Sequence, residues 1–267
     1  MKINLLDKKF ATFLDQYANW NGVKTIALSF DMDWAPEYMI QNIINILNHY
    51  NVNSTFFVTH KSEKIIQTYE SQIEVASHLY VSPNSSQGDK LDIVLDKLRN
   101  WYPNKIIEGN RFHLLNQSYR DLVYMGRNGY RYDISALRFN TPYLLPAFHK
   151  DLNLTLLSYF WEDGICENSN IPLSLSEVNM DSPGIKVFNF HPMNIYINGH
   201  NSQARLNFLK KNPDLLNTPE EIASKFRKKG PGASNLIHEL LDYCISNNIK
   251  VVPVKEIVDN FVKYFLR

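Results

Sequence analysis

The fold of this chain is indicated most clearly by the segment Thr25-Ile26-Ala27-Leu28-Ser29-Phe30-Asp31-Met32-Asp33-Trp34. Its first six residues are mostly apolar and predict a buried strand. Pro36, two residues beyond the segment, suits the first turn of a helix. Apolar residues then recur at helical spacing, as Met39, Ile40, Ile43, Ile44 and Leu47. A buried strand that leads directly into an amphipathic helix is typical of α/β folds.

Strand-like and helix-like stretches keep alternating after this segment. Further strands are expected at residues 55–59, 73–77, 105–113, 130–134, 154–159, 185–190 and 250–254. Helices are expected at residues 62–69, 91–98, 118–127 and 254–266, and from about residue 234. This alternation predicts a parallel sheet with helices outside it, either as a barrel or as an open doubly wound sheet. We interpret residues 1–267 as a single domain in which residues 198–232 form a polar excursion.

Charge and composition exclude several classes of protein. The 267 residues include 28 Lys and Arg against 27 Asp and Glu, so no nucleic acid is expected as a partner. The sequence contains no run of roughly 18 apolar residues, so no transmembrane helix is predicted. Charged residues interrupt positions 1–21, where a signal peptide needs an apolar stretch. Cys166 and Cys244 make neither a disulfide framework nor a CxxC pair. These features predict a cytoplasmic protein.

Groups suited to metal binding or proton transfer follow several of the expected strands. They are Asp31, Asp33, His78, Arg111, His113, Asp163 and His191. The carboxyl ends of parallel strands carry the site in α/β folds, and residues two apart on a strand share a face. Taken singly, a strand-end Asp is more often a helix cap or turn residue, and a lone His is more often structural. The joint placement of all seven residues favours one functional site.

Short motifs in this order resemble the polysaccharide deacetylases of the NodB-homology superfamily, which are similar to carbohydrate esterase family 4. The resemblance is carried by residues 29–34, 54–59, 74–78, 129–133 and 190–192. The spacing of these motifs is most similar to the WbmS-like branch, whose members sit among surface-polysaccharide (O-antigen) biosynthesis proteins. The resemblance covers about residues 24–256 and implies an α/β fold, a distorted (β/α)7-type barrel in one domain.

The resemblance also implies an activity, the metal-dependent hydrolysis of an N-acetyl group on an amino sugar. Asp31 would be the general base, and Arg111 would orient it. His191 would be the general acid, paired with Asp163. The implied cofactor is a divalent metal, Zn²⁺ in first place, with Co²⁺, Fe²⁺ or Ni²⁺ as alternatives.

For the metal site, the resemblance implies Asp33 and His78 as ligands. It would place a second histidine four residues after His78, but that position is Ser82. Serine is a poor ligand for zinc, which prefers His, Cys and carboxylates. His113 is the favoured third ligand, because its strand is expected beside the strand of His78. Asn84 is the alternative, and His60, water or the absence of a metal also stays open.

Aromatic side chains near the motif ends suit the binding of a sugar ring. Trp34, Tyr80 and Trp161 are expected to contact the substrate, although ordinary packing would also explain each of them. The amino-sugar substrate could be free, nucleotide-linked or lipid-linked, the last at the periphery of the inner membrane. Two alternatives stay open: a deformylase or other C–N hydrolase on the same fold, and a catalytically degenerate member that binds glycan.

Overall fold

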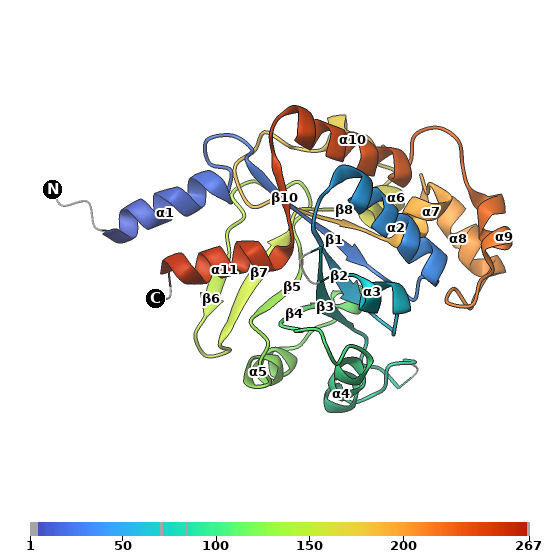
Figure 1. The fold of residues 1–267 in the computed structure, drawn as a ribbon, viewed down its shortest axis with the longest axis horizontal. Coiled ribbons are helices and arrows are strands. Elements are labelled where there is room, and N and C mark those ends of the chain that lie inside the picture. The colour runs from blue at the N-terminus through green and yellow to red at the C-terminus, as the bar shows by residue number, and fades with distance from the viewer. Residues whose placement is uncertain (1–4, 70–71, 84, 266–267) are drawn as a thin grey trace.

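The computed structural model describes residues 5–69, 72–83 and 85–265, and this part of the chain forms one ten-stranded sheet surrounded by helices (Figure 1). The strands are β1 Thr25–Asp31, β2 Ser54–Val58, β3 Ile73–Leu79, β4 Gly109–Phe112, β5 Tyr132–Leu137, β6 Ala147–His149, β7 Leu154–Tyr159, β8 Trp161–Glu162, β9 Val187–Phe190 and β10 Lys250–Val252. The helices are α1 Leu5–Gln16, α2 Glu37–Tyr50, α3 Glu63–Gln67, α4 Leu91–Trp101, α5 Tyr119–Arg127, α6 Asp163–Ser169, α7 Pro192–Ile197, α8 Ser202–Lys211, α9 Glu220–Ala223, α10 Ala233–Ser246 and α11 Val254–Phe265. The alternation confirms the predicted α/β class.

The sheet curls until its two ends meet near Phe160. The strand order is β6-β7-β5-β4-β3-β2-β1-β9-β8, with β10 also paired to β1, and only the β6–β7 pair is antiparallel. β7 pairs with β5, whereas β8, which starts one residue after Phe160, pairs with β9 at the other end of the order. The N–H of Phe160 donates to the carbonyl of Val187 in β9 at 2.8 Å. The sheet is therefore a distorted barrel, as the resemblance implied.

The strand β1 lies in the wall of this barrel, between β2 and β9. All seven of its residues are buried, and it pairs with β2 and β10 on one side and β9 on the other. The predicted helix after it is α2, whose buried face comprises Met39, Ile40, Ile43, Ile44, Ile46 and Leu47. Asn51 ends α2 in the left-handed conformation, which closes the last helical turn. Burial of this strand–helix unit fixes the carboxyl end of β1, from which Asp31 emerges.

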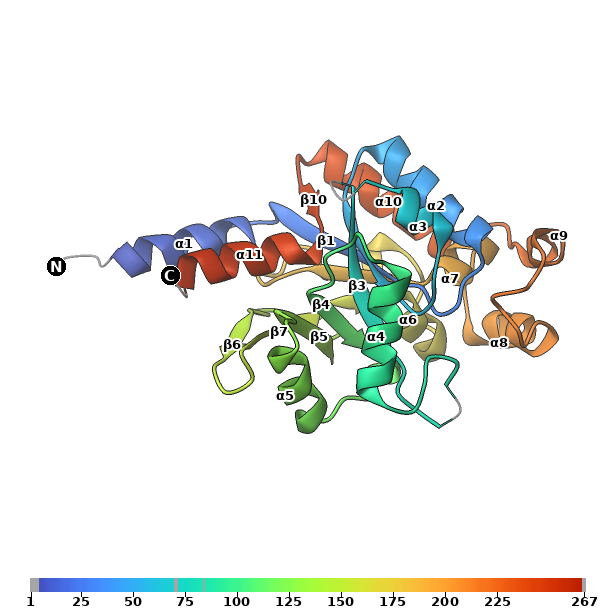
Figure 2. The same ribbon diagram turned by 60° about the horizontal axis from the view of Figure 1, so that its bottom comes forward.

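Several elements differ from the sequence predictions. β4 begins at Gly109 rather than residue 105, because the N–H of Lys105 bonds to the carbonyl of Tyr102 in a turn after α4. The strands β6 and β8 and the helices α1, α6, α7, α8 and α9 were not predicted. α1 packs along α11, so elements from the two ends of the described chain lie side by side (Figure 2). None of the helices in the described ranges is long and apolar enough to span a membrane.

The amino ends of the strands enclose a cavity of about 330 Å³ beside Glu74. The carboxylate of this residue accepts hydrogen bonds from the Thr55 hydroxyl at 2.5 Å, the Tyr132 hydroxyl at 2.6 Å and the backbone N–H of Lys255 at 2.9 Å. Burial raises the pKa of Glu74, and these three hydrogen bonds partly oppose that rise. The network ties β3 to β2, β5 and the start of α11.

Candidate active site

The barrel brings the predicted site residues together at the carboxyl ends of its strands. Asp31 is the last residue of β1, and Asp33 follows it by two. On neighbouring strands, His78 lies in β3, and His113 directly follows β4. On the other side of β1, His191 directly follows β9. These elements are consecutive in the strand order β4-β3-β2-β1-β9, so their ends meet at one edge of the barrel.

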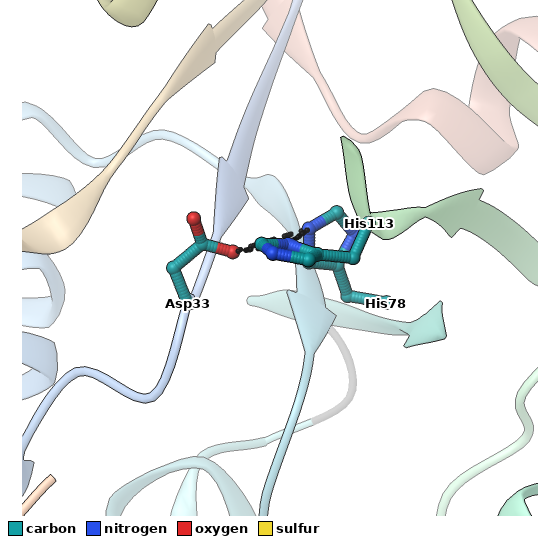
Figure 3. Close-up of side chains that lie close together, drawn as sticks. All are labelled: Asp33, His78 and His113. Carbon is teal, nitrogen blue, oxygen red and sulfur yellow. Dashed lines mark hydrogen bonds and ion pairs between the residues drawn. The ribbon is translucent and has the colours of Figure 1, made fainter. Parts of the chain in front are cut away.

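Asp33, His78 and His113 converge on one point (Figure 3). Asp33 Oδ1 lies 3.2 Å from His78 Nε2 and 3.1 Å from His113 Nδ1, and the two ring nitrogens are 3.2 Å apart. Ligands of a tetrahedral zinc ion with bonds of about 2.0–2.1 Å stand roughly 3.3 Å from one another. The spacing and chemistry of the three side chains therefore fit a divalent metal.

Hydrogen bonds around this triad support the same interpretation. His78 Nδ1 lies 2.8 Å from the backbone carbonyl of Arg111, which fixes the proton on Nδ1 and leaves Nε2 free to bind a metal. Asp33 Oδ1 is buried without a hydrogen-bond partner among the described residues. Burial opposes the charge of Asp33, but the adjacent histidines hold the pKa of its carboxyl well below the usual value. The triad thus offers one carboxylate and two imidazole nitrogens to a cation.

The turn that carries Asp33 is conformationally unusual. Asp33 and Trp34 have φ values of 40° and 57°, in the left-handed region that residues other than glycine seldom adopt. The Thr59 hydroxyl accepts a hydrogen bond from the N–H of Trp34 at 2.9 Å, and the N–H of Ala35 bonds to the carbonyl of Met32 at 2.7 Å. Such strain persists where the surroundings enforce it, and here it aims the Asp33 carboxylate at the two histidines.

Asp31 lies beside the triad in a fully paired environment. Arg111 Nη1 donates to Asp31 Oδ1 at 2.8 Å, and Asn189 Nδ2 donates to Asp31 Oδ2 at 2.9 Å. The Arg111 guanidinium is sandwiched between the rings of Phe57 and Tyr159, with its central carbon 4.2 and 4.3 Å from the ring centroids. Burial alone would raise the pKa of the Asp31 carboxyl, but Arg111, His78 and His191 together outweigh burial and keep this pKa below its usual value. Asp31 is therefore ionised at neutral pH.

His191 and Asp163 form a second pair across the triad from Asp31. Asp163 Oδ1 lies 2.6 Å from His191 Nδ1, and Asp163 Oδ2 accepts the backbone N–H of His191 at 2.9 Å. The other ring nitrogen, Nε2, lies 3.6 Å from Asp33 Oδ2. Burial would lower the pKa of His191, but the Asp163 carboxylate raises it well above the usual value. His191 thus presents a protonated Nε2 toward the triad.

The three predicted substrate-contacting aromatics occupy different environments. The rings of Trp34 and Tyr80 meet the His113 ring edge-on, at centroid distances of 5.3 and 5.0 Å. Trp34 also lines the larger cavity at the site. Trp161 is only 1% exposed and packs against Phe190 at 5.0 Å between ring centroids. It therefore supports the site from within the core, and the neighbouring Glu162 faces the cavity.

The structure also bears on the missing second histidine. His113 fills the third position of the triad, as favoured from the sequence. Ser82 lies in the loop after β3, where its N–H bonds to the carbonyl of Gly88, and it is not part of the triad. Asn84, the alternative ligand, lies outside the described residues.

Two adjoining cavities open on the triad, with volumes of about 370 and 210 Å³. Both are lined by Asp33, His113, Leu114, Glu162 and His191. The sequence predicts no role for Glu162, which accepts a hydrogen bond from the Tyr159 hydroxyl at 2.6 Å. Its position directly before Asp163 was the available signal, but a single carboxylate in a short motif is not informative alone.

Comparison with known proteins gives this fold and site a family. Residues 28–208, more than half of the chain, match the WbmS-like family model, which is described as polysaccharide deacetylase. The chain therefore belongs to the WbmS-like polysaccharide deacetylase family.

Solved structures share the fold. WbmS of Bordetella bronchiseptica, a candidate polysaccharide deacetylase involved in O-antigen biosynthesis, matches with a TM-score of 0.72 and 22% identity over 85% of this chain and 91% of its own. A candidate polysaccharide deacetylase from Mycobacterium smegmatis matches with a TM-score of 0.56 and 15% identity over 91% and 92%. The Bc1960 peptidoglycan N-acetylglucosamine deacetylase matches with a TM-score of 0.51 and 12% identity over 92% and 95%. At these identities the likeness concerns the fold alone, and no curated protein sequence matches the chain.

Proposed function

We propose that this chain is a metal-dependent amide hydrolase that removes an N-acetyl group from an amino sugar. The observation that carries the proposal is the convergence of Asp33, His78 and His113 beside two charged groups of opposite sign. Asp31 is an ionised carboxylate, and His191 is a protonated imidazole. A base and an acid that flank one metal site are the two groups that hydrolysis of an amide requires.

The residues divide the chemistry between them. A divalent cation, with zinc as the first choice, would polarise the amide carbonyl and lower the pKa of a water molecule when held by the triad. Asp31 accepts the proton of the attacking water, and Arg111 keeps this carboxylate ionised. His191 donates its Nε2 proton to the nitrogen that leaves, while Asp163 holds the opposite side of the ring. The C–N bond breaks, and the products are acetate and a free amino sugar.

The substrate class rests on the family and on one related protein. WbmS is described as involved in O-antigen biosynthesis, and we extend a surface-polysaccharide role to this chain. Location in the cytoplasm or at the inner membrane stays a prediction of the sequence.

Metal analysis and acetate release test this function together. Purified protein loaded with Zn²⁺, Co²⁺, Fe²⁺ or Ni²⁺ should retain about one ion, and His78→Ala should lose it. His49→Ala is the matched control, because His49 is exposed on α2. The metal-loaded protein should release acetate from acetamido sugars that are free, nucleotide-linked or lipid-linked. Release of formate alone from N-formyl sugars would favour a deformylase. If the protein neither retains a metal nor releases an acyl group, the proposed hydrolysis is contradicted and a glycan-binding protein is favoured.

A further inference from the structure

The larger cavity extends from the triad to a second group of polar residues. Its lining includes Asp33 and His191 at one end and Asn194, Asn168 and Arg205 at the other. Those three come from the helices α7, α6 and α8, of which α6 and α7 directly follow β8 and β9. At about 370 Å³, the cavity is in the size range of pockets that hold small molecules. This second end is therefore fixed relative to the catalytic residues.

Asn194 is the most informative residue at this end. Its side chain is only 1% exposed and lines the cavity, yet neither Oδ1 nor Nδ2 has a hydrogen-bond partner among the described residues. A buried amide left without partners costs folding free energy for each unsatisfied group. Asn194 lies on the first turn of α7, three residues after His191. Its unused amide therefore belongs to the same pocket as the predicted general acid.

Arg205 supplies a positive charge to the same cavity. It is the only lysine or arginine among the described residues that line the cavity. Arg205 Nε lies 3.4 Å from Glu167 Oε2, but in a geometry that leaves Nε without a hydrogen bond within the described ranges. Burial raises the pKa of Glu167 to about 8, so this carboxyl is largely uncharged at neutral pH and does not neutralise Arg205. The Asn168 side-chain oxygen accepts from Arg205 Nη2 at 3.3 Å and orients the guanidinium.

We propose that Asn194 and Arg205 form a subsite for an anionic oxygen group, a carboxylate or a phosphate, carried by the amino-sugar substrate. The inference deepens the proposed function and rests on it. Arginine is the side chain best suited to binding carboxylate and phosphate oxygens, and the Asn194 Nδ2 supplies a further donor. Outside the triad, Glu162 is the one carboxyl group among the described residues that line this cavity. Glu162 also lines the smaller cavity beside Asp31 and accepts a hydrogen bond from Tyr159. It belongs to the catalytic end of the cavity.

Three related sugars separate the two sources of negative charge. N-acetylglucosamine is neutral, N-acetylglucosaminuronic acid carries a ring carboxylate, and N-acetylglucosamine 1-phosphate carries the phosphate through which a nucleotide or lipid is attached. We expect the metal-loaded protein to release acetate from at least one anionic sugar with a kcat/KM about tenfold or more above that of the neutral sugar. Preference for the uronic acid identifies a ring carboxylate, and preference for the 1-phosphate identifies the linkage to a carrier.

Variants assign this preference to the subsite. Arg205→Gln should lower kcat/KM for the preferred anionic sugar about 10- to 100-fold, mainly through KM, while metal content stays at about one ion. Asn194→Asp places a competing carboxylate in the pocket and should therefore also lower kcat/KM for the preferred anionic sugar. Lys210→Gln is the matched control, because it removes one charge from the exposed surface of the same helix. It should keep the preference intact.

Two kinetic results would overturn the subsite. One is equal kcat/KM for all three sugars, and the other is a preference that survives both Arg205→Gln and Asn194→Asp. If no sugar releases acetate, the proposed function fails, but calorimetry with the same anionic sugars still decides the subsite. Binding that is lost in Arg205→Gln and kept in Lys210→Gln supports it. If neither anionic sugar binds, the proposed subsite is refuted, because the Asn194 amide then hydrogen-bonds only to water.

Discussion

The two ends of the barrel both hold a carboxylate beside a cavity, but they differ in how completely their polar groups are paired. At the amino end, Glu74 accepts three hydrogen bonds next to a cavity of about 330 Å³. At the carboxyl end, the cavity of about 370 Å³ is lined by Asp33, Asn194 and Arg205, each with a buried atom that lacks a partner in the described ranges. None of the described residues lining the amino-end cavity has such an atom.

This difference teaches that cavity volume alone does not identify the site. The cavities at the two ends have similar volumes, but unpaired buried polar atoms of the described lining residues occur only at the carboxyl end. Each unpaired buried group costs folding free energy, which a bound metal or substrate can recover. The strained φ of Asp33 lies at the same end. We therefore assign stability to the Glu74 end and chemistry to the Asp31 end, as is usual for parallel barrels.

The largest expected effect comes from making the same carboxylate-to-amide change at both ends. Asp31→Asn removes the predicted general base, so kcat should fall roughly 10²- to 10⁴-fold. The fold should persist, because the amide oxygen can still accept from Arg111. Acetate release under saturating substrate, with circular dichroism as the check on folding, measures this loss.

Glu74→Gln is the matched control for Asp31→Asn. Its amide can accept from Lys255 and donate to the Tyr132 hydroxyl, and it lies at the opposite end from the triad. Its kcat should stay within about twofold of the wild-type value. Equal losses in the two variants, or near-normal turnover by Asp31→Asn, would erase the distinction between the two ends.

A smaller effect concerns the ligand that replaces the missing histidine. His113→Ala should lower the affinity for Zn²⁺ at least about 100-fold, because it removes one of three ligands from the triad. Competition with a chromogenic chelator measures this affinity. Tyr80→Phe is the control, since it retains the ring that packs against His113. Unchanged zinc affinity in His113→Ala would remove His113 from the metal site.

Much of the fold could be predicted because its signals are local. The apolar run before Asp31 marks β1, and the spacing of apolar residues after Pro36 marks α2. The predicted third ligand depended only on His78 and His113 following adjacent strands, and the pairing of β3 with β4 places them together. Residues near a strand end are predictable because the sheet fixes where strand ends lie.

Other parts of the site could not be predicted, because they depend on packing between distant segments. Asn189 reaches Asp31 from β9, which is 158 positions away in the chain. Arg205 lies on α8 within the stretch interpreted only as a polar excursion, and no motif marks it. Asn194 differs from any surface asparagine only by being buried without a partner, which a sequence does not reveal.

The smallest expected effect is a difference in how the two carboxylates respond to pH. The pKa of Asp31 is lowered in the folded protein, so its ionisation stabilises the fold above about pH 3.8, and this stabilisation is lost only at lower pH. The pKa of Glu74 is raised, so its ionisation costs stability as pH rises above about 4.5. As pH falls below about 3.8, the Tm of wild type should fall relative to Asp31→Asn, because protonation of Asp31 removes its ion pair with Arg111. As pH rises from 5 to 8, the Tm of wild type should instead fall relative to Glu74→Gln. Thermal unfolding in the presence of a chelator measures both differences, and parallel curves for the two variants would show that the ends do not differ electrostatically.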